Sequence, residues 1–259
     1  MRKLEMFVDS HAHLQWRSFD DDREDVIARA ARAGVKVIIN IGFDLDGSRE
    51  AIRLAEEHEG LFATVGIHPH NANQLDDSVL SKLKRLSQNS KVVAIGEIGL
   101  DYYRDLSPRE AQKKAFEAQL SLAQELRLPV VVHSRNATAD VLHTLGEYKG
   151  EIQGVMHCFS GSMEVAKQCI ELGFYISFVG SVTFPNASKL HRLVKTISLS
   201  KVLLETDSPW LAPQEMRGRR NQPAFLVFTA RKIADLRGIS VEKLGDITTE
   251  NAQNLFRLP

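Results

Sequence analysis

The sequence is poor in cysteine, and it lacks both a long apolar run and an excess of one charge. Its two cysteines, Cys158 and Cys169, are too few for the disulfide framework of a small secreted protein. Charged residues interrupt every apolar run well short of a membrane span, and we predict no signal peptide, so we expect a cytoplasmic protein without a membrane segment. Lysine plus arginine and aspartate plus glutamate both number 33, which excludes attraction of the whole molecule to nucleic acid.

The sequence does contain a regular alternation of two kinds of segment. Short apolar runs rich in β-branched residues are predicted as strands at residues 6–8, 35–41, 61–67, 92–98, 128–132, 154–156, 175–179 and 202–204. Segments with helical periodicity separate them at residues 21–33, 47–58, 77–87, 109–126, 137–145, 163–172 and 187–197. The residues predicted to end helices are Gly34, Gly60, Gly146 and Gly173.

This alternation predicts an α/β fold. Strands that alternate with helices form parallel βαβ units, and runs that are apolar on both faces fit a sheet covered on both sides. Eight such units indicate a single (β/α)8 TIM barrel. We therefore predict one domain over residues 1–259, with extra C-terminal helices at residues 224–237 and 241–256.

Six residues of metal-ligand type lie at the C-terminal ends of five of the predicted strands. They are His11 and His13 on the first strand, Glu97 on the fourth, His133 on the fifth, His157 on the sixth and Asp207 on the eighth. In a TIM barrel these strand ends meet at the C-terminal mouth, where active sites lie. Alone, Glu97 could cap a helix and Asp207 could form an Asx turn. Gathered at one mouth, the set predicts a metal centre, because uncompensated charge there would be costly to bury.

The number of ligands favours two ions. Six protein ligands exceed one tetrahedral site that keeps a position open for water. Glu97 lies on a strand between the His11/His13 side and the His133/His157 side, so we expect it to bridge two divalent ions, with zinc, manganese and magnesium as candidates. Paired ions stabilise the attacking and leaving oxygens of a displacement. We assign catalytic roles to Glu97 as the bridge and to Asp207 as the group that orients the attacking water.

The motifs that contain these residues resemble those of the TatD family of metal-dependent deoxyribonucleases, within the amidohydrolase-like metal barrels. The resemblance runs from Asp9 to Phe256. It rests on segments 9–13, 66–70, 96–103, 129–135, 157–161 and 205–209, and on Asn221, Pro223, Thr249, Asn251, Leu255 and Phe256. Several motifs in the family's order make the resemblance specific.

The resemblance implies hydrolysis of ester bonds, with exonuclease activity on DNA as the best-known activity of the family. It assigns one ion to His11, His13, Glu97 and Asp207, and the other to Glu97, His133 and His157. His68, in the matching Gly-x-His-Pro-His motif, is expected to contact substrate or a metal-bound water. The family often has Cys and Asp where this chain has Ala12 and Gln15, a departure that concerns the substrate rather than the ligands.

Other residues have weaker assignments. Arg135 could bind a substrate phosphate or pair with a neighbouring loop, and Glu205 is expected to orient a metal ligand. The basic residues 217–220 could grip a nucleic-acid backbone or form a solvated loop. Tyr102 and Tyr103 could stack on a base or pack over the barrel rim.

These observations predict a metal-dependent hydrolase, in the first instance a 3′–5′ exodeoxyribonuclease. Its partner would be DNA or another nucleic acid, with no obligate protein partner. A D-aminoacyl-tRNA deacylase and a small-molecule amidohydrolase or deaminase are the alternatives, although many amidohydrolase barrels bridge their metals with a modified lysine where this chain has Glu97. A metal-binding protein without catalysis is disfavoured, because the ligand set includes a group that can activate water.

Overall fold

The computed structural model describes residues 6–259, and it confirms the predicted TIM barrel. Residues 1–5, which the predicted domain includes, lie outside the described part. Eight parallel strands pair in sequence order: β1 (Phe7–Ala12), β2 (Val35–Asn40), β3 (Leu61–Val65), β4 (Val92–Asp101), β5 (Val130–Arg135), β6 (Gly154–Met156), β7 (Phe174–Phe178) and β8 (Val202–Leu204). A bridge between Ala12 and Ser208 joins the end of β1 to the segment after β8.

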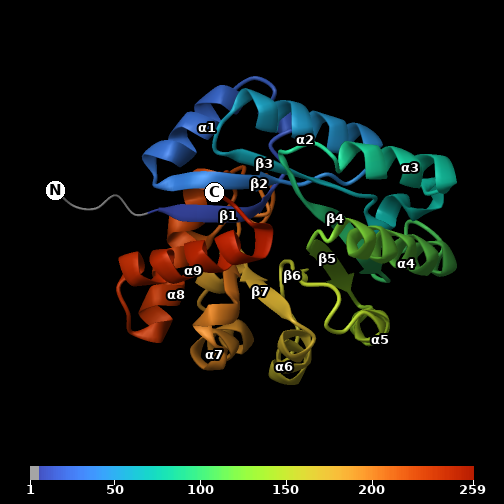
Figure 1. Ribbon diagram of the computed structural model, residues 1–259. Helices are drawn as coiled ribbons and strands as arrows, with labels where there is room; N and C mark the ends of the chain where they lie inside the picture. Colours follow the sequence, from blue (N-terminus) through green and yellow to red (C-terminus); the bar gives the residue numbers. More distant parts are fainter. Residues whose placement is uncertain (1–5) are drawn as a thin grey trace.

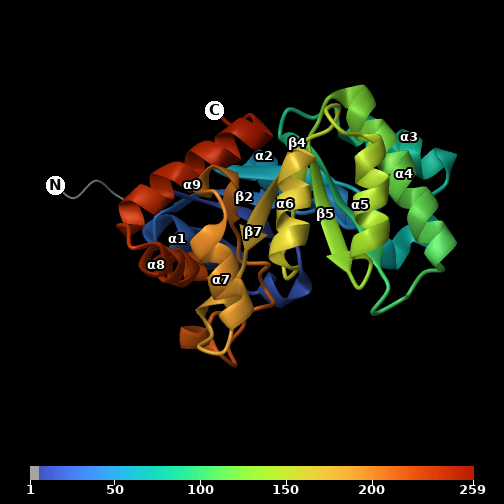
Figure 2. The same cartoon turned by 90° about the horizontal axis from the view of Figure 1, so that it is seen from below.

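Helices surround the strands in both overall views (Figures 1 and 2). They are α1 (Arg23–Arg32), α2 (Leu45–Glu57), α3 (Asp77–Leu86), α4 (Arg109–Leu126), α5 (Thr138–Glu147), α6 (Met163–Glu171), α7 (Ser188–Thr196), α8 (Leu226–Arg237) and α9 (Val241–Phe256). Short 3-10 turns lie at Arg17–Phe19, Pro69–Gln74, Gly180–Thr183, Leu199–Lys201, Gln214–Met216 and Pro223–Phe225. Among residues 6–259, no helix combines the length and the apolar character needed to cross a membrane.

Side-chain caps explain where several helices begin. The Asp44 carboxylate accepts a hydrogen bond from the Gly47 backbone at the start of α2, and Asp76 does the same for α3. Ser162 and Ser240 cap α6 and α9 with their hydroxyl oxygens. Each cap satisfies one of the backbone N–H groups that the first turn of a helix leaves unpaired. The caps therefore fix the points where loops from the strand ends turn into helices.

The barrel interior is closed with apolar side chains at its N-terminal end. The second residues of seven strands belong to one apolar cluster: Val8, Phe62, Val93, Val131, Val155, Tyr175 and Leu203. Ala252, Leu255 and Phe256 of α9 pack against them. α9 also contacts β8 and β1, and Figure 1 shows it beside β1. Because this end is filled, polar side chains gather at the C-terminal mouth.

Several predicted boundaries were wrong. β1 continues past Val8 to Ala12, since Asp9 and Ala12 pair with β2. β4 continues to Asp101 because residues 98–101 pair with β5. Gly146 lies inside α5 rather than at its end, as glycine near the end of a helix costs only about 1 kcal/mol relative to alanine. The left-handed glycine that follows α5 is Gly150, with φ of 83°.

Candidate metal centre

The strand pattern explains why ligand-type side chains point into the mouth. Successive side chains alternate between the two faces of a strand, so residues two apart share a face. In three strands, the residue two positions after a member of the apolar interior layer is polar. These pairs are Val131 and His133, Val155 and His157, and Leu203 and Glu205. The polar residues therefore form the next layer of the same interior, nearer the C-terminal mouth.

One group of donor atoms surrounds the end of β1. The Nε2 atoms of His11 and His13 lie 3.0 Å apart. Glu97 Oε2 lies 3.5 Å from His11 Nε2, and Asp207 Oδ1 lies 3.6 Å from His11 Nε2 and 3.7 Å from His13 Nε2. Four ligands about 2.1 Å from one tetrahedral ion lie about 3.4 Å from each other. The spacing of these donors fits a single divalent ion.

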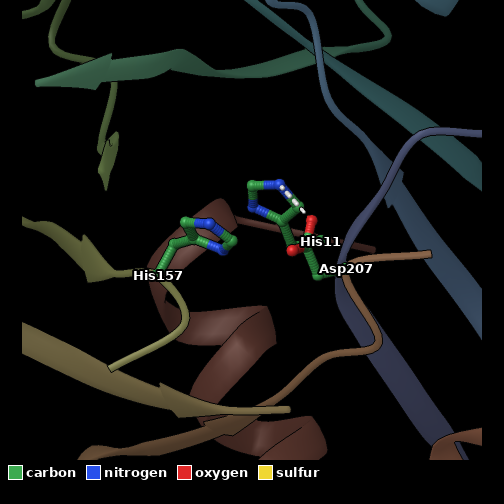
Figure 3. Close-up of side chains that lie close together, drawn as sticks. All are labelled: His11, His157 and Asp207. Carbon is green, nitrogen blue, oxygen red and sulfur yellow. Dashed lines mark ion pairs between the residues drawn. The ribbon is translucent and has the colours of Figure 1, made fainter. Parts of the chain in front are cut away.

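A second group surrounds the other oxygen of Glu97. Glu97 Oε1 lies 2.8 Å from His133 Nδ1, 3.4 Å from His157 Nε2 and 3.5 Å from His68 Nε2. The His157 ring also stacks on His11, with 3.8 Å between ring centroids, so the two groups adjoin. Figure 3 shows His11, His157 and Asp207 close together, with the His11–Asp207 ion pair dashed. The two carboxylate oxygens of Glu97 thus face two different sets of nitrogen donors.

His11 and His13 of the first group and His68 of the second have a protonation state that suits metal binding. Burial lowers the pKa of His11 well below its usual value, and it lowers the pKa of His13 and of His68 to about 4. These imidazoles are therefore neutral at pH 7, the form that binds metals. Burial opposes ionisation of Glu97, but the adjacent histidines hold its pKa well below the usual range, so it presents a carboxylate.

Two buried carboxylates orient the histidines of the second group. Glu205 Oε1 accepts hydrogen bonds from the Cys158 backbone at 2.6 Å and lies 3.0 Å from His157 Nδ1. Asp101 Oδ2 lies 3.1 Å from His133 Nε2. A carboxylate on the second nitrogen of a metal-binding imidazole fixes its tautomer and ring orientation. The predicted position of Glu205 beside a ligand agrees with this geometry.

Sequence reasoning missed the contribution of Asp101. Besides His133, Asp101 Oδ2 contacts His70 Nε2 at 2.9 Å, while Oδ1 accepts hydrogen bonds from the backbones of Tyr103 and Arg104. The spacing could have indicated this role, because Asp101 lies four residues after Glu97 in the same buried strand. The missing information was that β4 continues this far.

Asp9 ties the two segments that carry the first group. Its carboxylate accepts hydrogen bonds from the His11 backbone at 3.3 Å, the Thr206 backbone at 2.9 Å and the Thr206 hydroxyl at 2.6 Å. The Asp207 backbone N–H donates to the His11 carbonyl at 2.9 Å. Asp207 itself adopts a left-handed backbone conformation, with φ of 54°, which aspartate tolerates better than most residues. The contact between β1 and the segment after β8 therefore sets the spacing of His11 and Asp207.

Comparisons with known proteins agree with this geometry. A family model described as TatD related DNase matches residues 8–257 of the chain. The chain belongs to the TatD family. It is 44% identical over 254 residues to the uncharacterized metal-dependent hydrolase YabD of Bacillus subtilis, covering 98% of this chain and 100% of YabD. It is 39% identical over 257 residues to a protein of Pantoea vagans named 3′-5′ ssDNA/RNA exonuclease TatD, covering 96% and 99% of the two chains.

A solved structure supports the same assignment. The crystal structure of YJJV, a TatD homolog from Escherichia coli, superposes with a TM-score of 0.93 at 32% identity, covering 99% of this chain and 100% of YJJV. The protein is thus a TatD-family metal-dependent hydrolase, with histidine and carboxylate clusters suited to metal binding.

The residues predicted to contact the substrate lie at different places in this TatD-family chain. His68 joins the second donor group, as given above. Arg135 is exposed at the end of β5, with its guanidinium 4.0 Å from the Tyr103 ring centroid. Tyr102 instead donates its hydroxyl to Asp140 at 2.7 Å. The structure brings His68 to the donor atoms and leaves Arg135 on the rim.

The basic loop at residues 217–220 makes contacts of its own. Arg220 pairs with Asp22 at 2.7 Å and lies over the Phe19 ring at 4.5 Å. Arg217 lies 6.0 Å from the Phe184 ring centroid, and Arg219 is exposed. Arg220 therefore helps to attach this loop to the segment before α1.

Proposed function

We propose that the protein is a two-metal phosphodiesterase. The observation that carries this proposal is the position of Glu97, whose Oε2 faces His11 while Oε1 faces His133, His157 and His68. A carboxylate with donors on both oxygens fits a bridge between two ions. The first ion would be held by His11, His13, Glu97 and Asp207, and the second by Glu97, His133 and His157. Zinc, manganese and magnesium are the candidate ions, because imidazole suits zinc and carboxylates also accept the other two.

We further propose that its substrate is single-stranded DNA, shortened from the 3′ end. Membership of the TatD related DNase family and the name of the Pantoea relative support a nucleic acid. The position of the donor groups at the barrel mouth suits a polymer end, since a strand can approach from solvent. Arg135, exposed at the rim, could contact the phosphate next to the scissile one.

The residues of the mouth have distinct tasks in this proposal. Bound divalent ions would polarise the phosphodiester and make water more acidic. Asp207 would accept the proton of the attacking water, since its carboxylate lies beside His11 and His13 at the mouth. Its side chain is 15% exposed, more than Glu97 at 5%, so it faces the approaching substrate. Asp101 and Glu205 hold the imidazoles of His133 and His157 in position.

The test combines a metal count with a substrate panel. Protein stripped by chelator and refilled with zinc or manganese should hold two ions per chain. It should then shorten a 5′-labelled single-stranded oligonucleotide from its 3′ end, and chelator should stop the reaction. A maximum of one ion in an intact chain would exclude the two-metal model. Hydrolysis of small amides or of D-aminoacyl-tRNA, with oligonucleotides left intact, would assign the chain to one of the alternative functions.

A further inference from the structure

Large exposed apolar side chains gather on two loops at the mouth. Within residues 6–259, those exposed are Met6, Tyr103, Leu106, Trp210 and Leu211. Four of the five follow either β4 or β8, and these strands lie opposite each other in an eight-stranded barrel. Exposed apolar groups concentrated beside a functional site mark a binding surface. The metal-ligand groups lie between the two loops.

Trp210 and Phe43 are aromatic residues adjacent to the first donor group, and Trp210 is the more exposed of the two. The Trp210 ring centroid lies 5.2 Å from that of His13 and 5.0 Å from that of Trp16, both in edge-to-face geometry. Despite these contacts, Trp210 is 42% exposed. Tyr103 on the opposite loop is 59% exposed, and the Arg135 guanidinium lies over one face of its ring at 4.0 Å. Of these two exposed aromatic rings within residues 6–259, Trp210 is the one that contacts a histidine of the donor groups.

The backbone of Trp210 is held firmly. The Asn221 side-chain amide donates to the Trp210 carbonyl at 2.6 Å and to the Thr206 carbonyl at 2.8 Å, and Asn221 is buried. The Trp210 N–H donates to the Asp207 carbonyl at 2.9 Å. These bonds join the tryptophan to the segment that carries Asp207. With its backbone fixed in this way and its ring packed on His13 and Trp16, Trp210 loses little freedom when a ligand stacks on it.

We propose that Trp210 stacks on the base of the 3′-terminal nucleotide, and this rests on the proposed function. A base is separated from its phosphate only by the sugar, so a phosphodiester at the donor groups brings a neighbouring base to this rim. In a duplex both faces of an interior base are already stacked and its edge is paired, whereas an unpaired end offers a free face. Stacking on Trp210 therefore selects a single-stranded 3′ end of any sequence, since every base has an aromatic face.

The test removes the base and the ring separately. Two oligonucleotides are compared, one ending in thymidine and one ending in an abasic tetrahydrofuran residue. Wild-type protein should cleave the thymidine end with a kcat/KM about tenfold higher. Trp210→Ala should lose this preference, while Trp210→Phe should keep most of it. Leu106→Ala, an exposed apolar change on the opposite loop, should retain the wild-type preference.

A binding measurement separates this inference from the exonuclease proposal. In chelator, where hydrolysis stops, fluorescence anisotropy should show tighter binding of the thymidine-ended strand to wild-type protein and no such difference for Trp210→Ala. If that difference is found but metal-loaded protein leaves DNA intact, stacking stands and the exonuclease proposal fails. If Trp210→Ala keeps the wild-type preference, or if it loses bound metal, stacking by Trp210 is wrong.

Discussion

At the scale of single residues, the proposed function gives Asp207 two tasks, metal binding and proton acceptance, that a substitution can separate. Asp207→Asn keeps the shape and one carbonyl oxygen near His11, but the amide cannot accept a proton at neutral pH. We expect the variant to fold, to keep an ion in the second group, and to lose about 100- to 10,000-fold in turnover. Metal analysis beside the rate on a single-stranded oligonucleotide measures both effects.

Glu97→Gln provides the comparison for this prediction. Because both Glu97 oxygens face donor groups, its replacement should weaken both sites together, whereas Asp207→Asn should weaken only the first. Near-normal turnover in metal-loaded Asp207→Asn would contradict this prediction and show that Asp207 serves only as a structural turn residue.

The residues of the centre could be predicted from the sequence to different extents. His133 and His157 directly follow apolar runs, so strand parity alone turns them toward the mouth. The role of Asp101 could not be found this way. It depends on the pairing of residues 98–101 with β5, which brings Asp101 to His133 and is not visible in local composition.

At the scale of elements, the close approach of β4 and β5 depends on Gly99. Gly99 has φ of 135°, and a Cβ there would lie 2.0 Å from the His133 carbonyl oxygen. We predict that Gly99→Ala lowers the free energy of unfolding by about 2 kcal/mol or more, because backbone strain adds to the clash. The displaced β5 should also lose metal bound through His133. Urea denaturation and metal analysis measure the two consequences.

Gly150→Ala is the matched control. Gly150 also has positive φ, at 83°, but nothing lies within 4 Å of a Cβ there. This variant should lose about 1 kcal/mol through backbone strain alone and keep its metal. Equal losses in both variants would show that the contact with β5 is unimportant.

The elements themselves could largely be predicted, and their ends could not. Periodicity located every strand of the barrel because a strand buried on both faces is a continuous apolar run. Ends depend on tertiary pairing. β1 continues through the polar residues to Ala12 because β2 offers partners, and α5 passes Gly146 because the left-handed turn comes later, at Gly150.

At the scale of the whole molecule, the barrel has an apolar end and a polar end. α9 fills the N-terminal end, while the mouth collects buried carboxylates and imidazoles that are suited to binding a cation. We predict that chelator lowers the melting temperature. An ion that binds only the folded state at 100 times its Kd adds about 2.7 kcal/mol, which for a chain of this size is about 5 °C or more per site.

Calorimetry with and without chelator measures this shift, and added zinc should reverse it. Glu97→Gln should show a smaller shift than the wild-type protein, since it lacks the shared ligand. Superimposable melting curves for stripped and refilled wild-type protein would mean that the mouth folds without an ion.

The balanced charge of the molecule predicts a shallow dependence of DNA binding on salt. Lysine plus arginine equals aspartate plus glutamate at 33 each, and Arg220 is paired with Asp22, so we expect few phosphate contacts around the mouth. For single strands the logarithm of affinity falls with the logarithm of salt concentration by about 0.7 per phosphate contact. We expect a slope of about −1 to −2, measured by anisotropy over a range of sodium chloride concentrations.

Arg135→Gln should make the slope shallower by about 0.7, since Arg135 is an exposed arginine beside the second donor group. A slope of about −4 or steeper in the wild-type protein would require a basic surface that holds the strand along its length, and recognition would then not centre on the strand end at the mouth.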